Sequence, residues 1–376
     1  MKKHMKTILA IAIYACGTNI FADTPARWSA ERANQWYANQ PWMVGCNFTP
    51  STAINQLEMW QADTFDLPTI DRELGWAQAI GFNTVRVFLH NLLWQQDSQG
   101  LIDRMEKLLT VADKHHIRVM FVLFDSCWDA NPQLGKQRAP KPFTHNSGWM
   151  QSPGAQYLYH PERLDELKPY VQGVVKHFRK DKRIAFWDVF NEPDNYNFNK
   201  SPDKDQEKIR QQACAELLKK TFAWAREMKP TQPLSCGVFL TQWDHPGELS
   251  SMGKIMLGES DLITFHSYAK LPEVRRCVGN LRRYGRPVIC TEYMARPEGS
   301  TFDPILGFFQ EEKVGAFNWG LVSGKTQTIY PWDSWTKPYT NEPPLWFHDI
   351  FRANGIAFSS AETNYIRQCT LRKPAF

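Results

Sequence analysis

The chain has 376 residues, 43% of them hydrophobic, so it is long and apolar enough for one large globular domain and does not have the composition of a disordered chain. Its formal charge of +5 falls to +2 without the three lysines in the first six residues, which argues against nucleic-acid binding. No apolar stretch of the sequence reaches the roughly 20 residues that a transmembrane helix needs.

The first 22 residues have the pattern of a secretory signal peptide. Three lysines precede an apolar stretch over residues 8–15, and small residues lie near Ala22. The sequence therefore predicts an exported protein, periplasmic or extracellular, whose catalytic domain spans residues 23–376.

Cys16 allows a second interpretation of the same segment. It follows Ile13, Tyr14 and Ala15, which loosely resemble the cleavage box of a bacterial lipoprotein, although tyrosine fits that box poorly. A lipid anchor on Cys16 is thus the alternative to cleavage near Ala22.

The other cysteines are scattered and lack the spacing of a zinc site or of a disulfide framework. The sequence therefore indicates no metal site. These cysteines are Cys46, Cys127, Cys214, Cys236, Cys277, Cys290 and Cys369.

After the signal segment, eight short β-rich apolar stretches alternate with amphipathic stretches, as in βαβ units around a parallel sheet. Eight parallel strands close a (β/α)8 TIM barrel, so we predict this α/β fold as a single domain. The predicted strands are residues 43–47, 84–89, 118–125, 184–191, 234–239, 262–268, 287–293 and 315–321.

Helical periodicity and end signals fill the gaps between these strands. Gly81 stops the first helix, Pro161 begins the third, and the connection after the fifth strand is short or irregular. The predicted helices are residues 70–80, 101–115, 161–178, 205–228, 272–284, 302–312 and 345–354.

Long connections follow the third, fourth, fifth and eighth strands, and the carboxyl ends of all strands share the face where barrels hold their active sites. Enlarged loops on this face predict a cleft there. Several of their tryptophans either line that cleft or pack the loops down, namely Trp128, Trp149, Trp243, Trp332 and Trp335.

Two of the predicted strands end with a glutamate. Glu192 follows the fourth strand directly, and Glu292 lies at the end of the seventh, across the barrel mouth. Paired carboxyl groups suit acetal hydrolysis, because one donates a proton to the leaving oxygen while the other stabilises or attacks the anomeric carbon.

Other strand ends supply side chains that support such a pair. Arg86 could keep Glu292 anionic, Tyr268 could donate a hydrogen bond to it, and His266 points the same way by strand alternation. Asn191 is suited to binding a sugar 2-hydroxyl.

This ordered set resembles the clan A glycoside hydrolases, and most closely the cellulase-like family 5, over nearly all eight units. The resemblance implies that Glu192 is the general acid/base and Glu292 the nucleophile of a retaining double displacement, which needs no cofactor. It also implies that Arg86, Asn191, His266, Tyr268 and Trp319 surround the cleaved bond, with a sugar stacked on Trp319. The residues that carry it are Arg86, Asn191-Glu192-Pro193, His266-Ser267-Tyr268, Thr291-Glu292-Tyr293 and Trp319.

The chain departs from family 5 at the end of the third strand. Members often have a sugar-contacting histidine there, whereas this chain has Asp125, Ser126, Cys127 and Trp128. We predict that Asp125 accepts a sugar hydroxyl in place of the histidine and that Trp128 contacts substrate.

Two other functions use the same residues. One is a barrel that binds carbohydrate without cleaving it, and the other is a transglycosylase in which a sugar intercepts the glycosyl-enzyme. Because both glutamates are present, we expect hydrolysis of β-linked poly- or oligosaccharides. The long loops after the third and eighth strands favour exo action or short oligosaccharides.

Overall fold

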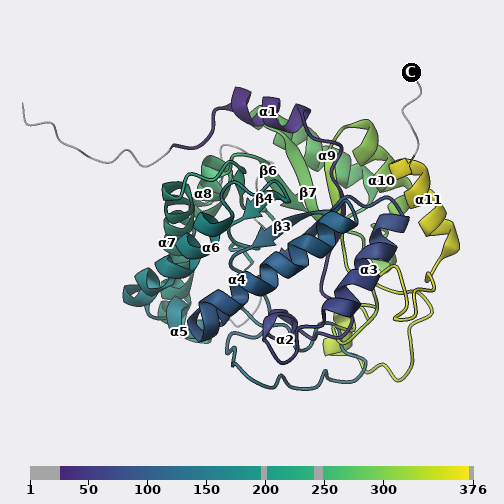
Figure 1. Cartoon of the computed structure of the whole chain (residues 1–376), viewed down its shortest axis with the longest axis horizontal. Coiled ribbons are helices and arrows are strands. Elements are labelled where there is room, and N and C mark those ends of the chain that lie inside the picture. Colours follow the sequence, from purple (N-terminus) through teal and green to yellow (C-terminus); the bar gives the residue numbers. More distant parts are fainter. Residues whose placement is uncertain (1–25, 196–200, 241–248, 372–376) are drawn as a thin grey trace, which may run out of the picture.

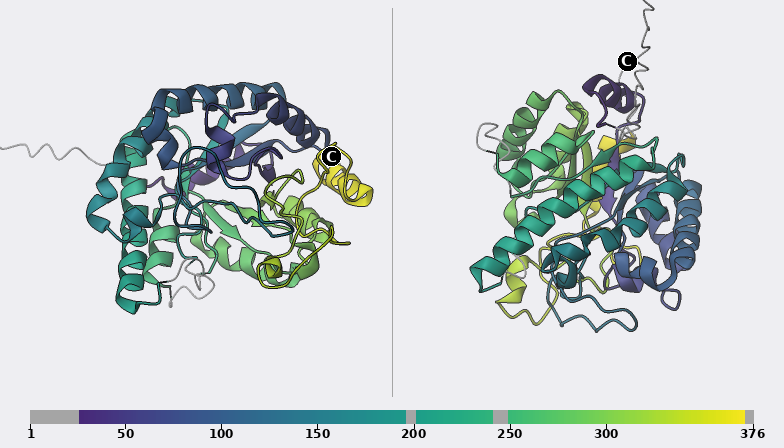
Figure 2. Two further views of the ribbon diagram at one scale, coloured as in Figure 1. Left: turned by 90° about the horizontal axis from the view of Figure 1, so that it is seen from below. Right: turned by 90° about the vertical axis from the view of Figure 1, so that its left-hand side faces the viewer.

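A computed structural model describes residues 26–195, 201–240 and 249–371 of the protein. Eight parallel strands form one sheet that curls into a barrel, and helices surround it (Figures 1 and 2). The predicted (β/α)8 barrel is therefore confirmed. The predicted signal peptide and Cys16 lie outside the described residues.

All eight strands occur where the sequence predicts them, and each begins within one residue of its predicted start. The predicted ends run one to four residues too far at most strands, because the apolar stretches continue into the turns that build the site. The strands are β1 (Val44–Asn47), β2 (Thr84–Phe88), β3 (Arg118–Val122), β4 (Ile184–Asp188), β5 (Leu234–Ser235), β6 (Ile263–His266), β7 (Val288–Tyr293) and β8 (Gly315–Trp319).

The hydrogen-bonded order of the strands is β5-β4-β3-β2-β1-β8-β7-β6, which leaves a seam between β5 and β6. Val238, just beyond β5, closes that seam by a parallel bridge to Phe265. Its amide donates to Thr264 O at 3.0 Å, and its carbonyl accepts from His266 N at 2.9 Å. The barrel is thus closed next to the strand that carries His266.

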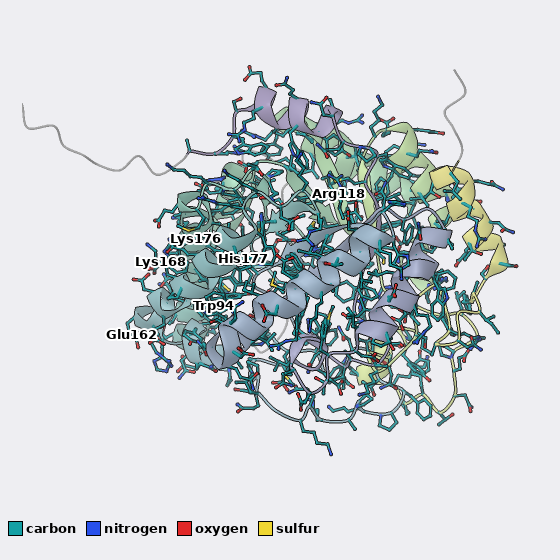
Figure 3. The ribbon with its side chains drawn as sticks, in the orientation of Figure 1. Trp94, Arg118, Glu162, Lys168, Lys176 and His177 are labelled. Atoms are coloured by element: carbon teal, nitrogen blue, oxygen red, sulfur yellow. The ribbon has the colours of Figure 1, made fainter. Side chains whose placement is uncertain are left out.

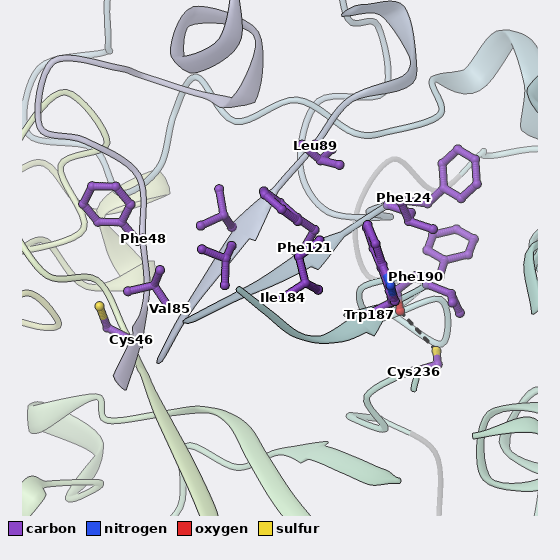
Figure 4. Packing of buried hydrophobic residues seen from close by; sticks show 14 of the residues in the cluster. Cys46, Phe48, Val85, Leu89, Phe121, Phe124, Ile184, Trp187, Phe190 and Cys236 are labelled. Atoms are coloured by element: carbon purple, nitrogen blue, oxygen red, sulfur yellow. Dashed lines mark hydrogen bonds between the residues drawn. The ribbon is translucent and has the colours of Figure 1, made fainter. Parts of the chain in front are cut away.

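Alternate residues of each strand point into the barrel or toward the helices. Met120 and Phe186 belong to a cluster that fills the barrel interior. Their neighbours Phe121 and Trp187 point the other way and pack against each other with ring centroids 6.0 Å apart (Figure 4). Both faces of the strands are therefore buried, as is usual for parallel sheets.

Most helices lie between successive strands as predicted. Helix α8 supplies the helix that the sequence did not indicate after the fifth strand. The helices are α1 (Ala30–Ala38), α2 (Gln56–Trp60), α3 (Leu67–Ala79), α4 (Asn91–Lys114), α5 (Ala155–Leu158), α6 (Lys168–Phe178), α7 (Lys204–Glu227), α8 (Ser251–Glu259), α9 (Leu271–Leu281), α10 (Phe302–Glu311) and α11 (Ser360–Leu371), with 3-10 turns η1 (Pro161–Leu167), η3 (Arg282–Tyr284), η4 (Arg296–Glu298) and η5 (Trp332–Trp335).

Helices α4 and α6 pack closely on the outside of the barrel (Figure 3). A side chain at Gly173 would lie 2.1 Å from the ring of Trp94, so only glycine admits this tryptophan between the two helices. On the same surface His177 pairs with Glu106 at 3.3 Å. None of the helices in the described ranges is both long and apolar enough to span a membrane.

The predicted helix over residues 345–354 is wrong. Its apolar spacing is helical, but Trp346 and Phe351 pack into two different clusters. Arg296 donates to the carbonyls of Trp346 and Asp349, at 3.1 and 2.8 Å, and to that of His348. These carbonyls accept from a side chain instead of from a helical backbone, and the last helix forms later, at α11.

We expect Arg296→Met to lower the free energy of unfolding by about 2–4 kcal/mol, because Arg296 is buried and the three carbonyls would lose their donor. The variant would also break the Arg296–Glu362 ion pair of 2.7 Å. Urea unfolding measures the change. Arg352→Met is the matched control, since the exposed Arg352–Glu342 pair should contribute less than about 1 kcal/mol. Equal effects of the two substitutions would contradict this account of the segment.

Candidate active site

A cavity of about 400 Å³ opens at the carboxyl ends of the strands. The chain segments after β3 and β8 gather at this end of the barrel, opposite α1 (Figure 1). Most of the predicted site residues line the cavity, namely Asp125, Trp128, Asn191, Glu192, Tyr268, Glu292 and Trp319. The other two, Arg86 and His266, are buried behind the glutamates and contact them.

Glu192 is held through both of its carboxyl oxygens. Its Oε1 lies 2.7 Å from Nδ1 of His266. Its Oε2 accepts from Asn195 Nδ2 at 2.8 Å and from the Cys127 thiol at 3.1 Å. Glu192 also has a left-handed backbone with φ of 46°, a strained conformation that tends to occur at functional sites.

Glu292 is held by a cation and a hydroxyl group. Arg86 Nη1 lies 2.7 Å from its Oε1, and the Tyr268 hydroxyl donates to its Oε2 at 2.7 Å. Arg86 is fully buried and also pairs with Asp188 at 2.7 Å, so its guanidinium is fixed from two sides. These contacts are those predicted for Arg86 and Tyr268, while their roles in catalysis stay predictions.

The two glutamates meet around His266. One oxygen of each carboxyl group and one ring nitrogen of His266 lie within 4.8 Å of one another. Such a trio could also hold a metal ion, but two carboxyl groups on either side of one reacting carbon need the same closeness. The geometry therefore brings together the pair that the sequence predicted.

Burial dominates the electrostatics of this pair. It raises the pKa of Glu192 to about 7, and the charge of Asp194 adds to the rise. Burial also raises the pKa of Glu292, whereas Arg86 and Tyr268 act to lower it. Loss of water contact is therefore the largest effect on the pKa of both glutamates.

His266 takes part in this pair as a neutral ring. Burial lowers its pKa to about 4, and its Nε2 is enclosed without a hydrogen-bond partner. Its Nδ1 lies 2.7 Å from Glu192 Oε1 and 3.5 Å from Glu292 Oε2, and two carboxyl oxygens so close favour the tautomer with the proton on Nδ1.

Asp125 contacts mainly other protein groups. Its oxygens accept from Asn191 Nδ2 at 2.9 Å, Trp149 Nε1 at 2.6 Å and the Cys127 amide at 3.0 Å. Asp125 thereby orients Asn191, whose Oδ1 accepts from Arg86 at 2.6 Å. Direct contact of Asp125 or Asn191 with a sugar stays a prediction.

Two pairs of tryptophan rings line the cavity, and Trp128 and Trp319 both pack against the cluster that contains Trp149. Trp319 lies edge-on to Trp149, with ring centroids 5.9 Å apart. Trp128 stacks on Trp335, with centroids 5.3 Å apart and an interplanar angle of 16°. Trp332 also lines the cavity, so four of the five loop tryptophans left open by the sequence lie at the site, namely Trp128, Trp149, Trp332 and Trp335. Trp243 lies outside the described residues.

Several cavity residues were not among the predicted site residues, and four of them, Cys127, His145, Asn195 and His348, carry polar side chains that could act at the site. Asn195 lies in the turn after Glu192 and Cys127 lies beside Asp125, so their nearness to predicted residues was a usable signal. His145 comes from the long connection after β3, which has no periodic pattern, and His348 comes from the segment after β8 whose helical spacing wrongly indicated a helix. Sequence spacing gave no signal for these two.

Comparisons with known proteins agree with this geometry. Residues 143–246, which include β4 and Glu192, match the model of Glycosyl hydrolase family 10. No curated protein matches the sequence. This match covers 104 of the 376 residues, and together with the barrel and its paired glutamates it indicates a glycoside hydrolase of the clan A type.

Solved structures resemble the chain in fold at low sequence identity. GH5_18 from Streptomyces cattleya, in complex with GlcNAc, is 14% identical with a TM-score of 0.58, and 89% of this chain and 81% of that chain are covered. The endo-1,4-beta-D-mannanase from Thermotoga petrophila is 16% identical with a TM-score of 0.54, covering 88% and 99%. The beta-mannanase from the blue mussel Mytilus edulis is 14% identical with a TM-score of 0.55, covering 88% and 92%. The likeness to family 5 is therefore one of fold, while the sequence match is to family 10.

Proposed function

We propose that the protein is an exported retaining β-glycoside hydrolase with Glu292 as nucleophile and Glu192 as general acid/base. The observation that carries this proposal is that one carboxyl oxygen of Glu192 and one of Glu292 lie within 4.8 Å of each other. Retaining enzymes have a separation of about 5–5.5 Å, whereas inverting enzymes need about 6.5–9.5 Å to admit a water molecule.

In the first step, a Glu292 carboxylate oxygen forms a bond to the anomeric carbon while the bond from that carbon to the leaving oxygen breaks. The proton of Glu192 goes to the leaving oxygen. In the second step, water attacks the anomeric carbon, gives its proton to Glu192 and releases Glu292. Arg86 and Tyr268 hold Glu292 ready for both steps.

The pKa of Glu192, raised to about 7, suits both of its roles. A group with a pKa near the working pH can carry a proton in the first step and accept one in the second. Glu292 has to stay ionised, which the ion pair with the fully buried Arg86 favours.

We propose β-linked oligosaccharides as substrates and β-mannosides as the first to test. The solved structures of similar fold include several mannanases, and one is a substituted form of GH5_18 in complex with Manb1-4GlcNAc. The loops after β3 and β8 flank the cavity, which favours cleavage at a chain end. Release of single sugars from manno-, cello- or xylo-oligosaccharides would support this, and mid-chain fragments would contradict it.

The stereochemistry of the first product tests the proposed mechanism. We expect NMR during hydrolysis of a 4-nitrophenyl β-glycoside to show the β-anomer first, with the α-anomer appearing only as the free sugar equilibrates. Initial formation of the α-anomer would reject the double displacement.

Export rests on residues 1–22, and its test is separate. We expect the mature protein to begin shortly after Ala22 and to lie in the periplasm or medium. A lipid-modified peptide beginning at Cys16 would favour the membrane-anchored alternative, and an intact N-terminus in the cell would reject both.

A further inference from the structure

Two histidines that the proposed mechanism does not use line the cavity. His145 lies between β3 and α5, and His348 lies between η5 and α11. Both are buried, with 2% and 1% of their surface exposed, and their ring centroids are 5.4 Å apart. Segments about 200 residues apart in the chain thus place two imidazole rings side by side at the substrate.

The hydrogen bonds of these rings fix where their protons lie. Nδ1 of His145 is 2.7 Å from the carbonyl oxygen of Tyr330, and Nδ1 of His348 is 2.5 Å from that of Met294. A carbonyl oxygen only accepts, so each Nδ1 carries a proton. Burial lowers the pKa of His145 to about 4 and that of His348 well below its ordinary value. Both rings are therefore neutral near pH 7, and each Nε2 has a free lone pair.

These two Nε2 atoms have no protein partner among the described residues. Nε2 of His266 is fully enclosed by protein and has no partner, whereas the Nε2 atoms of His145 and His348 are not among the fully enclosed atoms without a partner. Each lone pair is therefore open to the cavity that its ring lines. An acceptor in an apolar surrounding loses free energy unless a donor meets it.

The surroundings define which donor fits. Three carboxyl groups, those of Asp125, Glu192 and Glu292, line the same cavity, and an anionic sugar would meet their charge as well as two lone pairs. Sugar hydroxyl groups donate without adding charge. The ring centroids of His348 and Tyr268 are 5.6 Å apart, and the Tyr268 hydroxyl donates to Glu292. A sugar bound to His348 would therefore lie beside the nucleophile.

We propose that His145 and His348 determine specificity by accepting hydrogen bonds from hydroxyl groups of a neutral sugar bound beside Glu292. The proposal rests on the proposed function and deepens it. Unlike Arg86 or Asn191, whose polar atoms are held by other protein groups, the two histidines keep one acceptor each for substrate.

Two substitutions of each histidine distinguish the role of Nδ1 from that of Nε2. Asparagine can reproduce the Nδ1 donor that anchors the ring to a backbone carbonyl, but it removes the Nε2 acceptor. Glutamine can place an oxygen acceptor near the Nε2 position. We therefore expect His348→Asn and His145→Asn to keep their thermal unfolding temperature within a few degrees of the unsubstituted protein and to lose about 10- to 100-fold in kcat/KM, with His→Gln restoring part of the loss.

A substrate cycle supplies a measurement that a merely structural role would not change. The unsubstituted protein and each Asn variant are assayed with 4-nitrophenyl β-D-mannopyranoside, or the glucoside if that is the better substrate, and with its 2-, 3-, 4- and 6-deoxy analogues. For each histidine we expect one deoxy analogue with a kcat/KM about 10-fold or more below that of the parent glycoside in the unsubstituted protein. In the Asn variant this difference between analogue and parent should vanish.

The outcomes are distinct for the two levels of the argument. No hydrolysis of any parent glycoside by the unsubstituted protein would reject the proposed function, and the specificity proposal with it. Hydrolysis in which every deoxy penalty is the same in the variants as in the unsubstituted protein would overturn the role of the histidines and leave the function standing. Faster cleavage of a glucuronide than of the neutral glycosides would also overturn it.

Discussion

Replacing Glu292 with alanine is expected to lower kcat/KM for a β-glycoside by about 10⁴-fold or more, which corresponds to about 5.4 kcal/mol or more of lost transition-state stabilisation. Without its carboxylate there is no atom to form the glycosyl-enzyme, and Arg86 faces an empty space in place of its ion-pair partner 2.7 Å away. Steady-state hydrolysis of 4-nitrophenyl β-glycosides measures the loss.

Added azide should restore part of the turnover of Glu292→Ala, because a small anion can occupy the vacated space beside Arg86 and attack the same carbon. The product should be the α-glycosyl azide, since the attack comes from the face that Glu292 used. Glu298→Ala is the matched control, because Glu298 is an exposed glutamate a few residues further along the chain. Undiminished turnover in Glu292→Ala, or a β-glycosyl azide as its product, would remove Glu292 from the nucleophile's role.

The barrel could be predicted from the sequence because its strands are short apolar stretches at regular intervals. A residue such as Phe121 is apolar whichever side of the strand it faces, so the stretch is recognisable without knowledge of its partners. The site glutamates could be predicted for a related reason. Glu192 and Glu292 lie where apolar strands end, and the closed barrel brings all such ends to one face.

The cavity walls could not be predicted in the same way. The segment with Trp346 and Phe347 has helical spacing, but Arg296 from another connection binds its carbonyls and prevents a helix. His145 and His348 meet only because these irregular segments fold against each other. Contacts between two irregular segments leave no periodic pattern in the sequence.

The second large effect expected is a fall in kcat/KM above pH 7, by about tenfold for each further pH unit. Burial raises the pKa of Glu192 to about 7, so Glu192 carries its proton below this pH and loses it above. Only the protonated form can donate to the leaving oxygen of a substrate with a poor leaving group. This fall, the alkaline limb of the pH profile, should shift to higher pH in Asn195→Ala, because Asn195 donates to Glu192 at 2.8 Å and favours its ionised form.

Glu192→Ala should remove that limb altogether. Its kcat/KM should fall by about 10²- to 10⁴-fold for an alkyl β-glycoside. It should fall much less for a 4-nitrophenyl β-glycoside, whose leaving group needs no proton in the first step. A limb at pH 7 that persists in Glu192→Ala, or an equal loss with both leaving groups, would assign the proton to another group.

Stability changes that end near pH 7 have to be separated from this effect. Burial also raises the pKa of Glu73 to about 7, and carboxyl groups with raised folded-state pKa values stabilise the fold while protonated. Their contribution is complete below the pKa that the carboxyl group has in the unfolded chain and is lost as pH rises from that value to about 7, so the unfolding temperature should fall over this window and level off above it. Assays well below the unfolding temperature isolate the effect of the Glu192 proton. Glu73 accepts a hydrogen bond from Ser51 and does not line the cavity. Its ionisation would therefore weaken the fold of Glu192→Ala as much as that of the unsubstituted protein, but it would not restore the pH dependence of kcat/KM.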